Sequence, residues 1–178
     1  MALHAMIDLE TLGTKPDCVI LTLGAIKFNP FNTQEPHDGI YQKIDIDSQD
    51  KLGRTQDDST VEWWGKQTQS VQDEAFTDEG RISLERMTVE INKFLVGVDT
   101  IWAQGPAFDI VILENLYQQL GKPIPWNFWQ IRDSRTLFSL LPEDPRKAIR
   151  QEAHNALADC YYQAICVQKA YNKLGVTA

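Results

Sequence analysis

The sequence predicts an α/β protein in which a mixed β-sheet is flanked by helices. Three apolar, strand-like runs come first, over residues 5–10, 18–28 and 40–46, with short connections between them. Short connections favour an antiparallel meander, because parallel neighbours need a longer crossover. Strand-like and helix-like segments then alternate over residues 100–174, which is typical of strands joined through helices. Together the two patterns indicate a mixed sheet.

Two helical patterns follow the three strands. Residues 59–62, with the sequence Ser-Thr-Val-Glu, form a predicted capping box that starts a helix carrying Trp63 and Trp64. A longer helix is predicted downstream, because apolar residues recur there at helical spacing. These residues are Leu84, Met87, Ile91, Phe94 and Leu95.

The alternating half begins with a predicted strand over residues 100–103, and a helix over 108–120 follows it and ends at Gly121. Glycine just past a helical pattern is a common end signal. A further strand is predicted over residues 128–131 and a short apolar segment over 134–141. The last predicted element is a long helix, residues 155–174, with an apolar face formed by Leu157, Tyr161, Ala164 and Ile165.

Length and composition favour one folded unit. The chain has 178 residues, of which 43% are hydrophobic and 24% charged, so we expect a single domain over 1–178. The N-terminus has no basic, apolar signal pattern and no apolar run reaches membrane-spanning length, so we expect a cytoplasmic protein without a membrane partner. Cys18, Cys160 and Cys166 show no metal-ligand spacing and are predicted to be free thiols.

The net charge of −8 argues against binding of long nucleic acid through broad phosphate neutralisation, which needs clustered lysine and arginine. It does not exclude a nuclease. Carboxylates gathered around divalent cations repel a phosphate less than their formal charge suggests. Such a protein is expected to hold only a few terminal nucleotides.

Asp8 and Glu10 lie two residues apart on the first predicted strand. The period of two places both side chains on one face of the sheet, while Ile7 and Leu9 point into the core. Strand-borne carboxylates are ligands that Mg²⁺ accepts. Taken as an isolated pair, Asp8 and Glu10 are better explained as a solvated strand face than as a metal site, because short motifs have many chance matches.

Three further polar residues stand at predicted helix starts. Asp109 follows the strand at 100–103, where an open sheet commonly presents functional groups, although a helix cap is the simpler alternative. His154 and Asp159 are five residues apart, which is about 140° around a helix. His154 is therefore expected to precede the last helix while Asp159 lies within it. For His154 the alternative is an exposed loop histidine.

Asp8-Leu9-Glu10, the pair Phe108-Asp109 and the stretch from His154 to Asp159 together resemble the three motifs of the DEDDh branch of the DnaQ-like exonucleases. Their order and spacing match over nearly the whole chain. The resemblance implies an RNase H-like fold and 3′→5′ exonuclease activity on a single-stranded 3′ end. It also implies two divalent cations, Mg²⁺ or Mn²⁺.

The resemblance assigns a role to each of the five residues. Asp8 would bridge the two cations, Glu10 and Asp159 would complete the first, and Asp109 would help to hold the second. His154 would be the general base that deprotonates the attacking water. These roles agree with two-cation phosphoryl chemistry and with a base that titrates near neutral pH.

The resemblance also implies substrate contacts at Leu12, Phe108, Trp64 and Arg135. For Leu12 the alternative is turn packing, and for Trp64 it is the core, because two adjacent tryptophans cannot share a helical face. Arg135 is suited to a phosphate or to a structural ion pair. The chain departs from the common family pattern at Gln104, where many members have asparagine.

Other readings of the sequence stay open at this stage. A catalytically inactive nucleic-acid-binding module of the same fold would typically lack one of the five residues. A magnesium phosphomonoesterase with Asp8 as nucleophile commonly needs Asp where Glu10 stands. The sequence decides neither DNA against RNA nor a monomer against a homodimer. His4, His37 and Lys122 are interpreted as surface residues.

Overall fold

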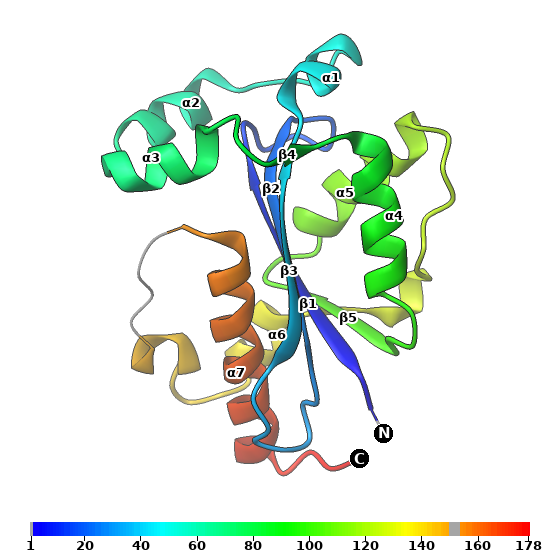
Figure 1. Ribbon diagram of the computed structural model, residues 1–178. Helices are drawn as coiled ribbons and strands as arrows, with labels where there is room; N and C mark the ends of the chain where they lie inside the picture. The colour runs from blue at the N-terminus through cyan, green and yellow to red at the C-terminus, as the bar shows by residue number, and fades with distance from the viewer. Residues whose placement is uncertain (1, 150–153) are drawn as a thin grey trace.

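The computed structural model describes residues 2–149 and 154–178. A six-stranded sheet runs through the centre of the protein (Figure 1). Its strands are β1 His4–Thr11, β2 Ile20–Phe28, β3 His37–Ile44, β4 Arg81–Ile82, β5 Thr100–Ala103 and β6 Ile131–Asp133. The strand order is β4-β3-β2-β1-β5-β6. Strands β1, β2 and β3 pair antiparallel, whereas β4, β5 and β6 join in parallel. The predicted mixed sheet is therefore confirmed.

Helices cover both faces of the sheet, with α4 and α5 on one side and α6 and α7 on the other (Figure 1). The α-helices are α1 Ile46–Lys51, α2 Asp58–Gly65, α3 Gln69–Phe76, α4 Leu84–Phe94, α5 Asp109–Gln119, α6 Ser134–Ser139 and α7 Ala156–Leu174. Two 3₁₀ helices, η1 Phe128–Gln130 and η2 Pro145–Ala148, flank α6 and its strand. Among the described residues, no helix combines the length and apolarity that a membrane crossing requires.

Strand β1 divides its side chains between the two helical layers. Ile7 and Leu9 are 1% and 5% exposed and pack in the core beneath α4 and α5. Met6 packs with the side chains of α6 and α7. Because the side-chain period of a strand is two, Asp8 and Glu10 face the same side as Met6. The predicted orientation of the two acids is confirmed, and it directs them toward α7.

Two predicted element boundaries are wrong: the end of the third strand, and the start of the helix that carries Trp63 and Trp64. The third strand ends at Ile44, because the Asp45 carboxylate accepts a hydrogen bond from the Ser48 backbone N–H at 2.8 Å and caps α1. Helix α2 begins at Asp58, before the predicted capping box, and Asp57 precedes it. The Asp57 carboxylate instead accepts hydrogen bonds from Thr14. A local side-chain cap therefore sets the first boundary, whereas α2 starts without a side-chain cap.

The predicted strand at 128–131 is mostly wrong. Phe128–Gln130 forms the 3₁₀ helix η1, which Asn127 and Gln130 close as a reciprocal capping box, and β6 starts only at Ile131. The two aromatic residues of η1 that suggested a strand, Phe128 and Trp129, are 80% and 61% exposed. Aromatic content therefore gave the wrong signal, because these rings pack against no core.

The last helix is confirmed, but of the four residues predicted to form its apolar face only Ala164 is fully buried, and Leu157, Tyr161 and Ile165 are partly buried. Small residues bury the helix against the sheet: Ala156, Cys160, Ala164, Val167 and Ala170. Leu157 and Tyr161 are only partly buried and pack at the margin of this layer. All three cysteines are free and buried, as expected.

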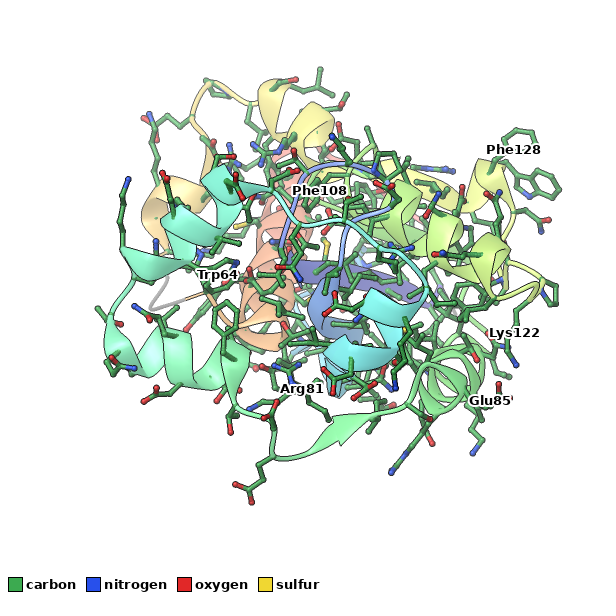
Figure 2. The ribbon with its side chains drawn as sticks, turned by 90° about the horizontal axis from the view of Figure 1, so that it is seen from above. Trp64, Arg81, Glu85, Phe108, Lys122 and Phe128 are labelled. Carbon is green, nitrogen blue, oxygen red and sulfur yellow. The ribbon has the colours of Figure 1, made fainter. Side chains whose placement is uncertain are left out.

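His4 was interpreted as a surface residue, and this is wrong. Its ring is 7% exposed and accepts a hydrogen bond at Nδ1 from the Trp102 Nε1–H at 2.9 Å. Burial lowers the pKa of His4 to about 4, so the ring is neutral and belongs to the core. His37 and Lys122 lie at the surface, where Lys122 pairs with Glu85 at 2.9 Å (Figure 2).

Candidate active site

The sequence-predicted acids converge where β1 meets the starts of α5 and α7. Asp8 and Glu10 project from β1 toward α7, as described above. Asp109, the first residue of α5, is 4% exposed, and its Oδ1 accepts a hydrogen bond from the Leu9 backbone N–H at 3.1 Å. This bond fixes the first turn of α5 against the strand that bears the other two acids. Three carboxylates therefore rest on rigid elements.

The start of α7 contributes the remaining two residues. The Asn155 side chain caps the helix by accepting hydrogen bonds from two backbone N–H groups of its first turn, at 3.1 and 3.0 Å. His154 precedes this cap and is exposed, whereas Asp159 lies in the first turn. One potential ligand atom each from Glu10, His154 and Asp159 lies within 4.8 Å of the others. The structure thus brings these residues together although they are distant in sequence.

A glycine on β2 allows α7 to approach this closely. Gly24 is the register partner of Asp8 across the β1–β2 pair. A Cβ atom at Gly24 would lie only 2.3–2.4 Å from backbone atoms of Ala156 and Leu157. The Cys160 thiol also donates to the Gly24 carbonyl oxygen at 3.3 Å. Sequence reasoning missed Gly24, although a glycine inside a strand pattern often marks such an approach.

Burial raises the pKa values of the four clustered carboxylates, and neighbouring acids add to this effect at Asp8 and Glu10. Burial, reinforced by Asp109, Glu10 and Asp159, raises the pKa of Asp8 well above its usual value. Burial, with Asp159 and Asp109 nearby, raises the pKa of Glu10 to about 8. Burial also raises the pKa of Asp109 to about 7 and that of Asp159 to about 6. An added positive charge is the natural partner for such a cluster.

A groove of about 300 Å³ opens beside the acids, and Glu10, Thr14, Thr60, Trp63 and Phe108 are among its lining residues. Trp63 is 40% exposed, and its ring lies edge-on to that of His154 at 4.8 Å between centroids. The groove therefore extends from the carboxylates to an exposed aromatic side chain.

The residues predicted to contact substrate differ in how far they are buried. Trp64 is 2% exposed, and its Nε1–H donates to the Thr11 carbonyl oxygen at 2.9 Å (Figure 2). Its ring packs in the same core cluster as Leu12, which is 4% exposed. Such burial favours the core alternative for Trp64, which also lines the groove, and the packing alternative for Leu12. Phe108 is partly buried and lines the groove.

Arg135 is exposed and lies close enough to Asp109 for its charge to act on that carboxyl group. Its Nε–H donates to the Gln104 carbonyl oxygen at 2.9 Å. The charge of Arg135 lowers the pKa of Asp109, against the larger effect of burial. No salt bridge joins Arg135 to a carboxylate within the described ranges. Its guanidinium keeps donors available at the site, which suits a phosphate.

Comparison with known proteins agrees with this arrangement. The sequence profile of the Rv2179c-like 3′-5′ exoribonuclease domain matches residues 3–171. The chain belongs to this family. This Rv2179c-like nuclease is 27% identical over 161 residues to the exodeoxyribonuclease of Enterobacteria phage T4, with 76% of this chain and 70% of the phage protein covered. The predicted resemblance to DEDDh exonucleases is confirmed, and the chain is a hydrolase of the nuclease class.

Solved structures show the same fold. Cell-death related nuclease 4 (CRN-4) matches with a TM-score of 0.68 at 14% identity, over 96% of this chain and 64% of that one. The nuclease domain of 3′hExo, a DEDDh family member bound to rAMP, matches with a TM-score of 0.61 at 15% sequence identity. The match covers 96% of this chain and 92% of that one. The zinc-bound E. coli ExoI–ssDNA complex matches with a TM-score of 0.67 at 19% sequence identity. The match covers 98% of this chain and 41% of that one. This Rv2179c-like chain therefore spans under two thirds of CRN-4 and of ExoI.

Proposed function

We propose that this nuclease removes nucleotides one at a time from the 3′ end of single-stranded nucleic acid. The observation that carries the proposal is the convergence of four carboxylates from β1, α5 and α7, with His154 at the edge of the cluster. In the described part of the chain, no lysine or arginine forms a salt bridge with Asp8 or Glu10. Their negative charge is therefore left for cations to balance.

The donor set fits two divalent cations. Carboxylate oxygens are the ligands that Mg²⁺ and Mn²⁺ prefer. In the proposed arrangement Asp8, Glu10 and Asp159 would hold one cation, and Asp8 with Asp109 would hold the other. Two such cations stabilise the attacking and the leaving oxygen of a phosphoryl displacement. The raised pKa values of Glu10 and Asp109 support this fit, because bound cations would restore the ionised forms.

The groove beside Glu10 is suited to the terminal nucleotide. Its volume of about 300 Å³ lies at the small end of ligand pockets, which favours one nucleotide over a duplex. Phe108 forms part of its wall and Trp63 its exposed aromatic side. We assign to Trp63 the stacking role that the sequence suggested for Trp64. The role proposed for Arg135, whose charge acts on Asp109, is contact with the phosphate.

Replacing Trp63 with alanine is expected to raise KM for an oligonucleotide roughly 5- to 150-fold, because stacking on one base contributes about 1–3 kcal/mol. Steady-state kinetics on a labelled oligonucleotide measures the change. Trp129→Ala is the matched control, since Trp129 is 61% exposed on η1 and the neighbouring Phe128 points away on the far side from Trp64 (Figure 2). Equal KM values for the two variants would contradict the stacking role.

His154 is the proposed general base. It precedes α7, is exposed, and lies close to Glu10 and Asp159, where a water attacking the terminal phosphate would stand. Replacing His154 with alanine is expected to lower kcat about 10²- to 10⁴-fold with little change in KM. His37→Ala, which removes an exposed histidine of β3, is expected to leave kcat unchanged. A His154 variant that keeps more than a tenth of kcat would exclude this role.

The direct test is digestion of 5′-labelled DNA and RNA oligonucleotides with Mg²⁺ or Mn²⁺. A ladder that shortens from the 3′ end is expected, and a 3′-phosphate should slow its appearance. The matched family is described as an exoribonuclease, whereas the phage relative is an exodeoxyribonuclease, so the two sugars are compared directly. Binding of the oligonucleotide without shortening under either metal would support the inactive binding module instead. Light scattering on the same sample distinguishes a monomer from a homodimer.

A further inference from the structure

Gln163 is a buried amide next to the carboxylate cluster. It lies on α7, one turn beyond Asp159, and is 5% exposed. Its Nε2–H donates to Asp8 Oδ1 at 3.4 Å. Within the described ranges its Oε1 is buried without a hydrogen-bond partner. Its buried neighbours on the helix, Cys160 and Ala164 among them, are small and mostly apolar.

A structural role explains this residue poorly. Burial of a primary amide costs about 1–3 kcal/mol unless hydrogen bonds compensate, and among the described residues the contact with Asp8 is the one hydrogen bond of this amide. At 3.4 Å that contact is long for an N–H···O bond, although contacts at catalytic sites commonly tighten once the site is loaded. An apolar side chain of similar shape would pack against Cys160 and Ala164 at lower cost. The amide is therefore better explained by what it does to Asp8.

We propose that Gln163 is a positioning residue that holds the Asp8 carboxylate in its metal-binding orientation. The inference rests on the proposed function, in which Asp8 contacts both cations. A donor on one oxygen fixes the rotation of the carboxylate and favours its ionised form. Outer partners of this kind typically change metal affinity or activity about 10- to 100-fold when removed.

A small cavity lies beside the Gln163 side chain. Gln104, just after β5, and Gln163 line the same cavity of about 20 Å³, together with Tyr162 and Arg146. The side-chain oxygen of Gln104 is also buried without a partner among the described residues. A cavity of this size accommodates about one water molecule, which would donate to both amide oxygens. Such a water would favour the orientation in which the Gln163 amide nitrogen faces Asp8.

Gln168 provides a matched comparison on the same helix. It is 7% exposed, close to the burial of Gln163. Its Nε2–H groups donate to the carbonyl oxygens of Asn29 and Gln34 at 3.0 and 2.8 Å, and these bonds tie α7 to the loop after β2. Gln168 therefore has satisfied structural bonds and no contact with the acids. Methionine has a similar length and no amide. We expect its substitution to affect metal binding and activity at Gln163, and stability at Gln168.

The experiment measures Mn²⁺ affinity by calorimetry, the melting temperature in chelator, and kcat at low and high Mn²⁺ for Gln163→Met and Gln168→Met. For Gln163→Met we expect an unchanged or higher melting temperature, about 10- to 100-fold weaker Mn²⁺ binding, and a loss of kcat that high Mn²⁺ partly restores. For Gln168→Met we expect a lower melting temperature with wild-type Mn²⁺ affinity and kcat.

The outcomes separate this inference from the proposed function. An active wild type in which Gln163→Met keeps wild-type Mn²⁺ affinity and kcat overturns the positioning role while the exonuclease assignment stands. A wild type that neither binds Mn²⁺ nor shortens any oligonucleotide overturns the proposed function itself. A destabilised Gln163→Met with unchanged Mn²⁺ affinity assigns the amide a purely structural role and also overturns the inference.

Discussion

Asp8→Asn is expected to lower exonuclease kcat/KM by about 10³-fold while raising the melting temperature of the metal-free protein. The loss of activity follows because Asp8 is the one carboxylate proposed to contact both cations, and removing a central electrostatic group typically costs about 10²- to 10³-fold. The gain in stability follows from the same geometry. Without cations, the Asp8 charge is opposed by Asp109, Glu10 and Asp159.

The stability effect depends on pH in a defined direction. Burial raises the pKa values of Glu10, Asp109 and Asp159 to about 8, 7 and 6. The folded protein therefore retains protons that the unfolded chain has released above about pH 4. Stability of the metal-free protein must then fall as the pH rises from about 4 to 8. Removing one charge by Asp8→Asn makes this decline shallower.

Melting curves in chelator at pH 5 and pH 8 test this prediction. At pH 8 we expect Asp8→Asn to melt at least about 3 °C above the wild type, since about 1 kcal/mol corresponds to 2–4 °C in a chain of this size. Asp73→Asn, at an exposed position of α3, should show no such gain. Added Mn²⁺ should stabilise the wild type more at pH 8 than at pH 5. A less stable Asp8→Asn protein at pH 8 would refute the charge repulsion.

The sequence was sufficient for the features that depend on local periodicity. The period of two on β1 placed Asp8 and Glu10 on one face, and helix-start signals located Asp109 and Asp159. The separation of His154 from Asp159 required the histidine to precede α7, as the structure has it. The mixed character of the sheet follows from the lengths of its connections, whereas its strand order was not predicted. The five polar residues were brought together as one site by the resemblance of their motifs to a known exonuclease family. A large part of the fold and the five proposed catalytic positions were therefore predictable.

Features that depend on contacts between distant elements were not predictable. Adjacent Trp63 and Trp64 are equivalent in sequence, and only the packing of α2 against the core decides that Trp63 is exposed. Gln163 gives no motif, since its partner Asp8 is 155 residues away. His4 is buried because Trp102 of β5 lies against it. In each case the deciding neighbour lies in another element, beyond the reach of periodicity.

Gly24→Ala is expected to give the second large effect, on stability and activity together. The added Cβ would lie 2.3–2.4 Å from backbone atoms of Ala156 and Leu157, and backbone cannot rotate away as a side chain can. Overpacking of this kind costs about 1–3 kcal/mol or more. Relief requires the start of α7 to move off β2, which carries Asp159 and His154 away from Glu10. A displacement of about 1 Å at a catalytic centre can lower the rate about 10²-fold.

Gly39 and Gly65 provide control substitutions for Gly24→Ala, with a smaller expected effect and no expected effect. A Cβ at Gly39 would lie too close to the flexible Cδ1 end of Leu157, at 2.8 Å, and at ordinary contact distance of 3.6 Å from Ile26, whereas a Cβ at Gly65 would meet nothing within 4 Å. Melting temperature and kcat should therefore fall most for Gly24→Ala, slightly for Gly39→Ala and not at all for Gly65→Ala. Activity lost in Gly24→Ala should exceed what its unfolded fraction explains, because the folded protein itself has a displaced α7. A Gly24→Ala protein with wild-type kcat and Mn²⁺ affinity would show that the close approach of α7 to β2 does not position the site.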